Sequence, residues 1–187
     1  QKEKFSIKNP FFLHAKSEYF LAKKDGKLCG RVVSINNYRH NESHNDRVGF
    51  FGFFESANDY AIAKALLDRV SESLKKEGMN RIRGPMNFST NEECGFLIEG
   101  FKEPPILMTP YNPPYYNDLM ERYGMRKVKD LYAYTCDIPE ELPEKILRVA
   151  RIAEKRGLMV RPIEMKKFEL DMKIFRDVYN SAWQKNW

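Results

Sequence analysis

Hydrophobic residues either alternate with polar ones or run continuously in three segments near the start of the chain, and these predict three β-strands. They cover residues 19–22, 28–36 and 48–55. Asp25-Gly26 separates the first two, and an Asp-Gly pair between apolar runs is typical of a tight hairpin. The third segment is apolar on both faces, so we expect a central strand covered on both sides.

A hydrophobic period of four residues comes next and predicts a long amphipathic helix. Its apolar face carries Ile62, Leu66, Val70 and Leu74. Asn58 or Asp59 can cap its start and Gly78 its end. A short strand over residues 81–86 follows, so strand, helix and strand form a right-handed parallel crossover.

Proline and glycine punctuate the next part of the chain. Asn112 and Pro113 predict the start of a helix over residues 115–123, which ends at Gly124. Residues 128–136 then alternate between apolar and polar positions, as a strand does. The order is therefore βββ-α-β-α-β, which indicates the α/β class.

The last part of the chain reads as the beginning of another unit. Beyond Pro139 and Pro143, a helical stripe over residues 146–153 ends at Gly157, and a brief strand at 159–161 precedes a helix over 168–182. We divide the chain into residues 1–138, one unit, and residues 139–187, a linker helix with the opening strand and helix of a second unit. Since Gln1 is no initiator residue and the last helix runs on to Trp187, we expect both ends to be truncated.

Composition narrows the function classes. The chain has 187 residues, 42% of them hydrophobic, and a net charge of +6 without any run of five like charges. A globular protein that does not bind nucleic acid is expected. Its three cysteines form no Cys-x-x-Cys pair, so we expect no metal site and a reducing, cytoplasmic location. No apolar run approaches the roughly 18 residues of a membrane span.

A polar loop follows the strand at residues 81–86 and contains the densest set of short polar side chains in the chain. We assign substrate binding to its members and to two later residues: Asn87, Ser89, Thr90, Asn91, Glu92, Tyr111 and Asn112. The alternative is a loop in which asparagine and serine side chains hydrogen-bond to their own backbone.

Several residues offer acid, base or nucleophile chemistry. Glu55 ends the buried strand and is the first choice for a general base. The helix that begins after Asn58 offers an anion site at its N-terminus, although plain helix capping is the simpler interpretation. His40 and His44 fall in an expected solvated hairpin loop, and Cys94 without a partner is typical of an inert side chain.

Three motifs carry a resemblance to a known family. They are Gly49 to Glu55, Arg83 to Asn91 and Tyr111 to Tyr116. Together with the βββ-α-β-α-β order, they resemble the GNAT superfamily of acyl-CoA N-acyltransferases, and more narrowly a group of longer GNAT-like proteins with two such units. The likeness spans about residues 5 to 187.

The resemblance implies a mixed, twisted sheet flanked by helices that lacks its first strand and helix. Acetyl-CoA or a longer acyl-CoA would lie in a cleft between residues 48–55 and 81–86, near Phe54, Ser56 and Asn58. Glu55 would serve as base and Tyr116 as acid in transfer to an amine. A small molecule or a lipid would supply that amine, with peripheral membrane contact, and the rest of the second unit would be a partner.

The sequence also departs from the family. The Gln/Arg-x-x-Gly-x-Gly/Ala loop that holds pyrophosphate is absent from residues 55–61, and Met120 stands where the general-acid tyrosine is usual. The resemblance therefore implies a degenerate unit that holds substrate. The alternative is a non-catalytic module of the same fold that binds a ligand or a partner.

Overall fold

The computed structural model describes residues 4–137 and 139–183. The chain divides into two compact units, Gln1–Tyr134 and Thr135–Trp187. We describe each unit by itself.

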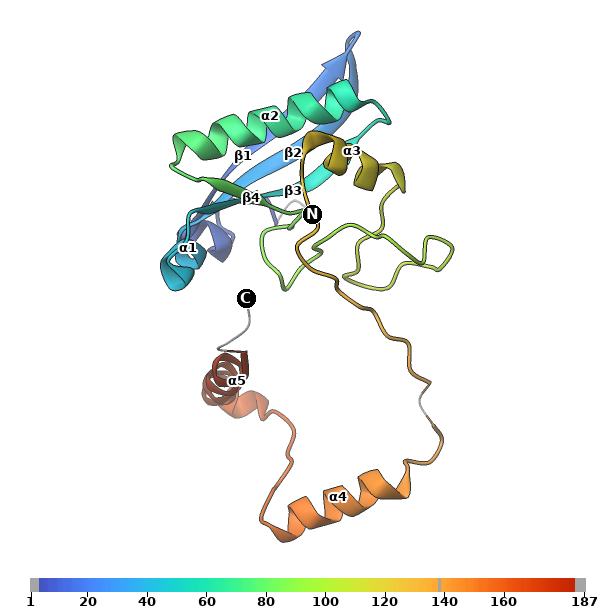
Figure 1. Cartoon of the computed structure of the whole chain (residues 1–187). Helices are drawn as coiled ribbons and strands as arrows, with labels where there is room; N and C mark the ends of the chain where they lie inside the picture. The colour runs from blue at the N-terminus through green and yellow to red at the C-terminus, as the bar shows by residue number, and fades with distance from the viewer. Residues whose placement is uncertain (1–3, 138, 184–187) are drawn as a thin grey trace. The chain divides into compact units, whose positions relative to one another are not determined.

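The first unit is built on a four-stranded mixed sheet in the order β1-β2-β3-β4 (Figure 1). Strands β1 (Ala15–Lys24), β2 (Lys27–Asn37) and β3 (Val48–Ser56) are antiparallel, and the short β4 (Arg81–Arg83) runs parallel to β3. Asp25 and Gly26 both have positive φ, as a two-residue hairpin turn requires. The expected mixed sheet of the α/β class is confirmed.

Helix α2 (Tyr60–Lys76) covers one face of this sheet (Figure 1). Its buried side chains pack on alternate residues of the strands, including Val32 and Phe51, to form the larger core. The Asp59 side chain accepts from the Ala61 N–H at 2.9 Å and so caps the helix, as the sequence predicts. A bare helix end would leave that N–H unpaired.

The opposite face of the sheet is only partly covered. Val33, Ile35 and Phe50 lie beneath Phe88 of the polar loop and beneath the 3-10 helix η1 (Pro10–Leu13). Among the described residues of the first unit, no helix lies over the half of this face nearest the Asp25-Gly26 hairpin, and Leu21 is 64% exposed there. A sheet with one face packed and part of the other bare presents apolar side chains to solvent.

Some expected elements differ in the structure. The supposed hairpin loop contains a short helix, α1 (Tyr38–His44), because the Asn37 side chain caps the His40 N–H at 3.1 Å. Strand β4 ends at Arg83 rather than Met86. Residues 128–136 form no strand in the described part of the chain, and neither do residues 159–161. Alternation favours a strand, but a strand also needs a neighbouring edge to pair with.

Helix α3 (Tyr115–Tyr123) begins and ends where the sequence predicts, and Gly124 closes it with φ 96°. The expected cap is wrong, however, since Pro114 occupies the cap position. Asn112 instead accepts a hydrogen bond from the Leu97 N–H at 2.7 Å and is buried. It ties two loop segments together.

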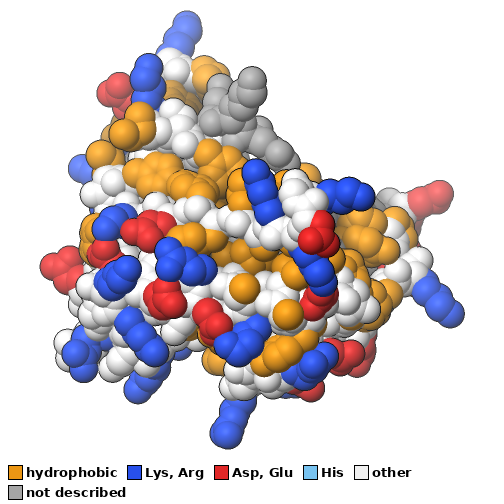
Figure 2. Space-filling model, turned by 90° about the horizontal axis from the view of Figure 1, so that it is seen from above, with side chains coloured by type: hydrophobic (Ala, Val, Ile, Leu, Met, Phe, Trp, Pro, Cys, Tyr) orange, Lys and Arg blue, Asp and Glu red, His pale blue; other side chains and the backbone are white. Residues whose placement is uncertain are grey.

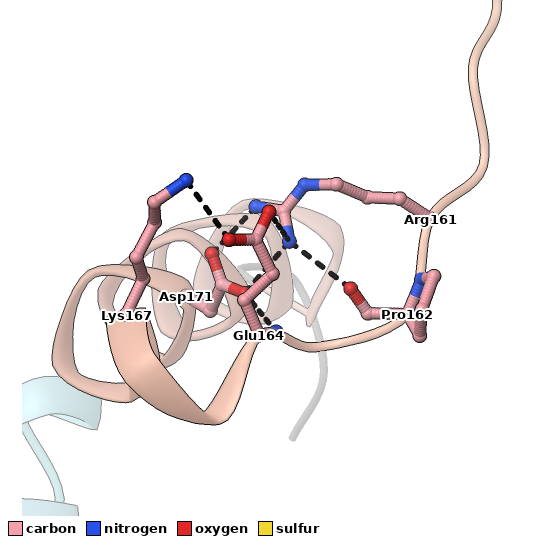
Figure 3. Close-up of polar contacts among 5 residues, drawn as sticks. All are labelled: Arg161, Pro162, Glu164, Lys167 and Asp171. Carbon is pink, nitrogen blue, oxygen red and sulfur yellow. Dashed lines mark hydrogen bonds and ion pairs between the residues drawn. The ribbon is translucent and has the colours of Figure 1, made fainter.

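The second unit contains α4 (Glu144–Lys155), the 3-10 helix η2 (Met165–Lys167) and α5 (Phe168–Trp183). Both long helices agree with the sequence prediction. Asp171, which is 6% exposed, joins the start of α5 to the preceding segment (Figure 3). Two Arg161 N–H groups donate to its oxygens at 2.7 and 2.5 Å, and the Glu164 N–H donates at 2.9 Å.

Candidate functional site

The end of β3 departs from regular strand geometry. Between Arg31 and Val33 of β2 the register with β3 shifts, because β3 has one residue more than its partner, which is a β-bulge. Phe53 lies in this bulge with φ 51°, a left-handed conformation that costs energy for an aromatic residue. The bulge removes the Phe53 N–H from the β2–β3 ladder and leaves it needing another partner.

Asn87 supplies that partner. Its Oδ1 accepts from the Phe53 N–H at 2.7 Å, while its Nδ2 donates to Glu93 Oε2 at 2.8 Å. Directly before it, the Met86 N–H donates to the Phe51 carbonyl at 2.8 Å. The polar loop is therefore bonded to β3 at two successive points.

Gly52 shows how closely the two segments approach. A Cβ on Gly52 would lie 2.0 Å from the Met86 carbonyl oxygen, so only glycine fits there. The expected cleft between residues 48–55 and 81–86 is thus wrong for the described structure, because the segment after β4 closes over β3 instead of diverging from it.

The last residue of β3 is held by the first turn of α3. Tyr116 Oη accepts from the Ser56 N–H at 3.0 Å, and Tyr115 Oη donates to the Ser56 carbonyl at 2.8 Å. Tyr116 is only 3% exposed, and burial raises its pKa to about 12. Tyr116 therefore stays protonated at neutral pH, and its role as an acid stays a prediction.

The N-terminus of α2 is also occupied. The Asp59 carboxylate accepts from the Ala61 N–H and from Lys24 Nζ, both at 2.9 Å. The Lys24 contact, first, and the Ala61 N–H lower the pKa of Asp59. A phosphate at this end would meet a fixed negative charge.

These observations test whether the residues present fit acyl-CoA, the cofactor that the resemblance implies. Phe53 and Ser56 carry backbone N–H groups near the end of β3, and Ala61 carries one in the first turn of α2. All three are already paired with side chains of this chain. Of the expected cofactor contacts, Phe54 is buried against Tyr116, Ser56 is buried, and Asn58 is exposed. These three pairings disfavour a cofactor pyrophosphate at this place, and the acyl-CoA contacts of this unit stay predictions.

Glu55 is different, because it remains accessible beside this closed region. Its side chain is 59% exposed, with one oxygen 3.2 Å from Arg31 and the other 3.4 Å from Tyr116 Oη. Arg31 is its neighbour across the β2–β3 ladder. A carboxylate and a guanidinium thus stand side by side at the strand end.

Next to this pair lies an apolar groove of about 320 Å³ on the uncovered face of β1 and β2. Its walls include Phe5, Tyr19, Leu21, Arg31, Val33 and Phe53. The sequence pattern did not predict it as a site. The signal that could have indicated the groove is the run from Tyr19 to Ala22. This run is apolar on both faces, although only one face of the described sheet has a helix to pack on.

Several of the predicted substrate residues of the polar loop have partners within the chain. Besides Asn87, Ser89 Oγ accepts from the Asn91 N–H at 3.3 Å, and Glu92 pairs with Lys4. Thr90 is exposed, and Tyr111 is 59% exposed with its hydroxyl 3.4 Å from the Phe101 carbonyl. The Ser89 contact is of the kind that the alternative expects, whereas Asn87 and Glu92 bond to other segments of the unit. The role of the loop in binding an acceptor stays a prediction.

The remaining candidates add little chemistry. His40 and His44 lie one turn apart on α1 with ring centroids 4.4 Å apart, and burial lowers the pKa of His40. Within residues 4–137 and 139–183, no three His, Cys, Asp or Glu side chains gather in a way that could hold a metal. Cys94 is half-buried, and burial raises the pKa of its thiol, which disfavours the reactive thiolate.

The surface shows no single charged patch on the face that Figure 2 presents. Basic and acidic side chains are interspersed there, with hydrophobic side chains exposed between them. None of the described helices combines the length and the apolar character needed to cross a membrane.

No protein-family model matches the chain. Protein YghO of Escherichia coli strain K12 is 32% identical over 187 residues, which are 100% of this chain and 48% of that protein. A bacterial ceramide synthase of Caulobacter vibrioides is 31% identical over 180 residues, 96% of this chain and 47% of that protein. The chain thus spans about half the length of these relatives.

Among solved structures, a ribosomal-protein-alanine N-acetyltransferase from Brucella melitensis biovar Abortus 2308 resembles 65% of this chain over 72% of its own length. The sequence identity is 18% and the TM-score is 0.36. In this chain itself, β3 and β4 are parallel neighbours in the sheet, and α2 lies between them in the sequence.

Proposed function

We propose that this chain is the acceptor-holding part of an N-acyltransferase that moves an acyl group from acyl-CoA to an amine. The order and pairing of its strands are GNAT-like, and its relatives include a protein named a ceramide synthase. A ceramide is the amide of a fatty acid with a long-chain amino alcohol, so its formation acylates an amine. The reaction would take place in the cytoplasm.

The observation that carries this assignment is the pairing of the three backbone N–H groups of Phe53, Ser56 and Ala61 with side chains of the same unit. Displacing Asn87, Tyr116 and Asp59 to admit a cofactor would break three hydrogen bonds, each worth about 1 kcal/mol. In this proposal acyl-CoA binds elsewhere in the protein, and the second GNAT-like unit expected from the sequence is its place.

Glu55 is the residue of this unit that meets the amine. An exposed carboxylate attracts an ammonium group, and it can accept the proton that the nitrogen must lose before or during attack on a carbonyl. Arg31 and Tyr116, which touch its two oxygens, fix its position. To accept that proton, the Glu55 carboxylate must be unprotonated and accessible when the amine arrives.

The direct test measures thiol release from acyl-CoA by the full-length protein across a panel of amines. We expect amine-dependent release, and we expect Glu55→Gln to raise the KM for the amine without raising the KM for acyl-CoA. The matched control is Glu99→Gln, at an exposed carboxylate of the same unit. A rise in the KM for acyl-CoA alone would show that this unit holds the cofactor instead.

A non-catalytic module is the second candidate, and the same internal hydrogen bonds favour it. Backbone N–H groups that are already paired within the unit need no ligand to satisfy them. If Glu55→Gln leaves turnover intact while deletion of residues 1–138 prevents folding of the protein, the module assignment replaces the acceptor-holding one.

A further inference from the structure

We propose that the groove on the uncovered face of β1 and β2 binds the hydrocarbon chain of a long-chain amino alcohol, with the head group at Arg31 and Glu55. This assignment deepens the proposed function and rests on it, because it names the class of acceptor and where that acceptor lies.

The walls of the groove suit a single hydrocarbon chain. Tyr19 pairs with Val33 and Leu21 with Arg31 across β1 and β2, so these four side chains line one face of the sheet. Phe5 forms a further wall, with ring centroids 5.7 Å from Tyr19 and 4.9 Å from Phe53. A volume of about 320 Å³ is at the lower end for ligand sites, and mostly apolar walls are typical of them.

The exposure of these residues, in the part of the chain that the structure describes, is what a binding surface requires. Tyr19 is 50% exposed and Leu21 is 64% exposed, although they lie in the middle of a paired strand. Contiguous apolar surface on a folded protein costs free energy in water unless a partner covers it, so such patches mark binding sites.

The charges at the groove select the head group. Arg31 lines the groove. Among the described residues its guanidinium makes one polar contact, of 3.2 Å with Glu55, which leaves other N–H groups to donate. Glu55 can accept from an ammonium group. An amine beside a hydroxyl matches this pair, since the ammonium donates to Glu55 and the hydroxyl oxygen accepts from Arg31.

Simpler lipids match the pair less well. The carboxylate of a fatty acid would gain from Arg31 but meet the negative charge of Glu55. A plain alkylamine would gain from Glu55 but meet the positive charge of Arg31. The charge pattern therefore favours a head group that presents a donor and an acceptor next to each other.

Binding is tested on the full-length protein by calorimetry without acyl-CoA, using amino alcohols with chains of about four to about twelve carbons. Each added methylene should raise the affinity about fourfold until the groove is full. Leu21→Glu should lower the affinity for the longest probe at least tenfold, because it places a charge in the groove. The matched control is Leu28→Glu, which changes a leucine of similar exposure, 62%, on β2 outside the groove.

Four results would overturn the proposal. Affinity that does not depend on chain length would exclude a hydrocarbon site, and equal losses in both leucine variants would place the probe elsewhere. Tighter binding of dodecanoate than of the amino alcohol of equal length would show that the head group is wrong. If another segment of the protein or a second copy covers this face, the probes will not bind and Leu21→Glu will change the oligomeric state or the stability instead.

Binding and turnover separate this proposal from the proposed function. Chain-dependent binding without any thiol release from acyl-CoA supports the groove assignment and removes the transferase. Thiol release that is equally fast with short and long amines keeps the transferase and removes the groove as the acceptor site.

Discussion

At the scale of single residues, the bulge at Phe53 makes Asn87 the key polar contact of the first unit. Asn87→Ala leaves the Phe53 N–H without its partner in a partly buried place. We expect the free energy of unfolding to fall by about 1–3 kcal/mol, the cost of an unsatisfied buried donor. Urea denaturation of the variant measures this loss. Thr90→Ala, an exposed change in the same loop, should stay within about 0.5 kcal/mol, and similar losses in both variants would contradict the role of Asn87.

Tyr116 should make the stability of the first unit depend on pH in the alkaline range. Its pKa in the folded protein is about 12, raised mainly by burial from the ordinary 10.0. A group with a raised folded pKa contributes its full stability below the unfolded pKa and loses it as the pH rises through the folded value. We therefore expect stability to fall between about pH 10 and pH 12, and to fall less steeply in Tyr116→Phe.

Denaturation at several pH values checks this expectation. The pKa of Tyr123 is raised to about 12 as well. Tyr123→Phe should therefore remove its own part of the loss of stability with rising pH, and this variant serves as the comparison. A slope that is the same in the wild type and in Tyr116→Phe would show that the Tyr116 hydroxyl is not buried in solution.

At the scale of elements, Asp171 connects the segment after α4 to the first turn of α5. The Arg161 guanidinium first, and then the Glu164 N–H, hold the pKa of this carboxyl well below its usual range. A depressed folded pKa means that the contribution to stability is present above the unfolded pKa and is lost as the pH falls through the folded value. The second unit should therefore lose helical signal in strong acid.

Asp171→Asn tests the same contact at neutral pH. The amide keeps the shape of the side chain but loses the charge that two Arg161 N–H groups approach. We expect faster hydrogen exchange at the Glu164 amide and less helix by circular dichroism. Asp177→Asn, at an exposed carboxylate further along α5, should change neither, and an equal effect in both variants would contradict the anchoring role of Asp171.

The elements also show how far the sequence determines the fold. The helices at α2, α3, α4 and α5 and the first three strands follow from periodicity and from Asp25-Gly26, because these signals are local. Helix α1 was missed because its start depends on one capping contact of Asn37. The closure over Gly52 and the groove beside Leu21 were missed because they depend on which segments meet across the sheet, and no local pattern records that.

At the scale of the whole molecule, the two units are joined by a segment with exposed side chains and no helix or strand over residues 125–137. Tyr132 is 75% exposed and Tyr134 is 85% exposed, although the alternation of residues 128–136 is that of a strand. A segment whose backbone makes no ladder hydrogen bonds needs little local unfolding to fit into the active site of a protease. We therefore expect brief trypsin treatment to cut first after Arg126, Lys127 or Lys129.

Mass spectrometry of the early fragments identifies the cuts. The core of the first unit lies within residues 15–120, so the N-terminal fragment should stay folded and its unfolding midpoint should match that of the uncut protein. The Lys24–Asp25 bond in the tight hairpin is the internal comparison, since β1 before the turn and β2 after it pair with each other. If that bond is cut first while residues 126–129 resist, the alternating segment is paired as a strand in solution, and the sequence prediction for it holds after all.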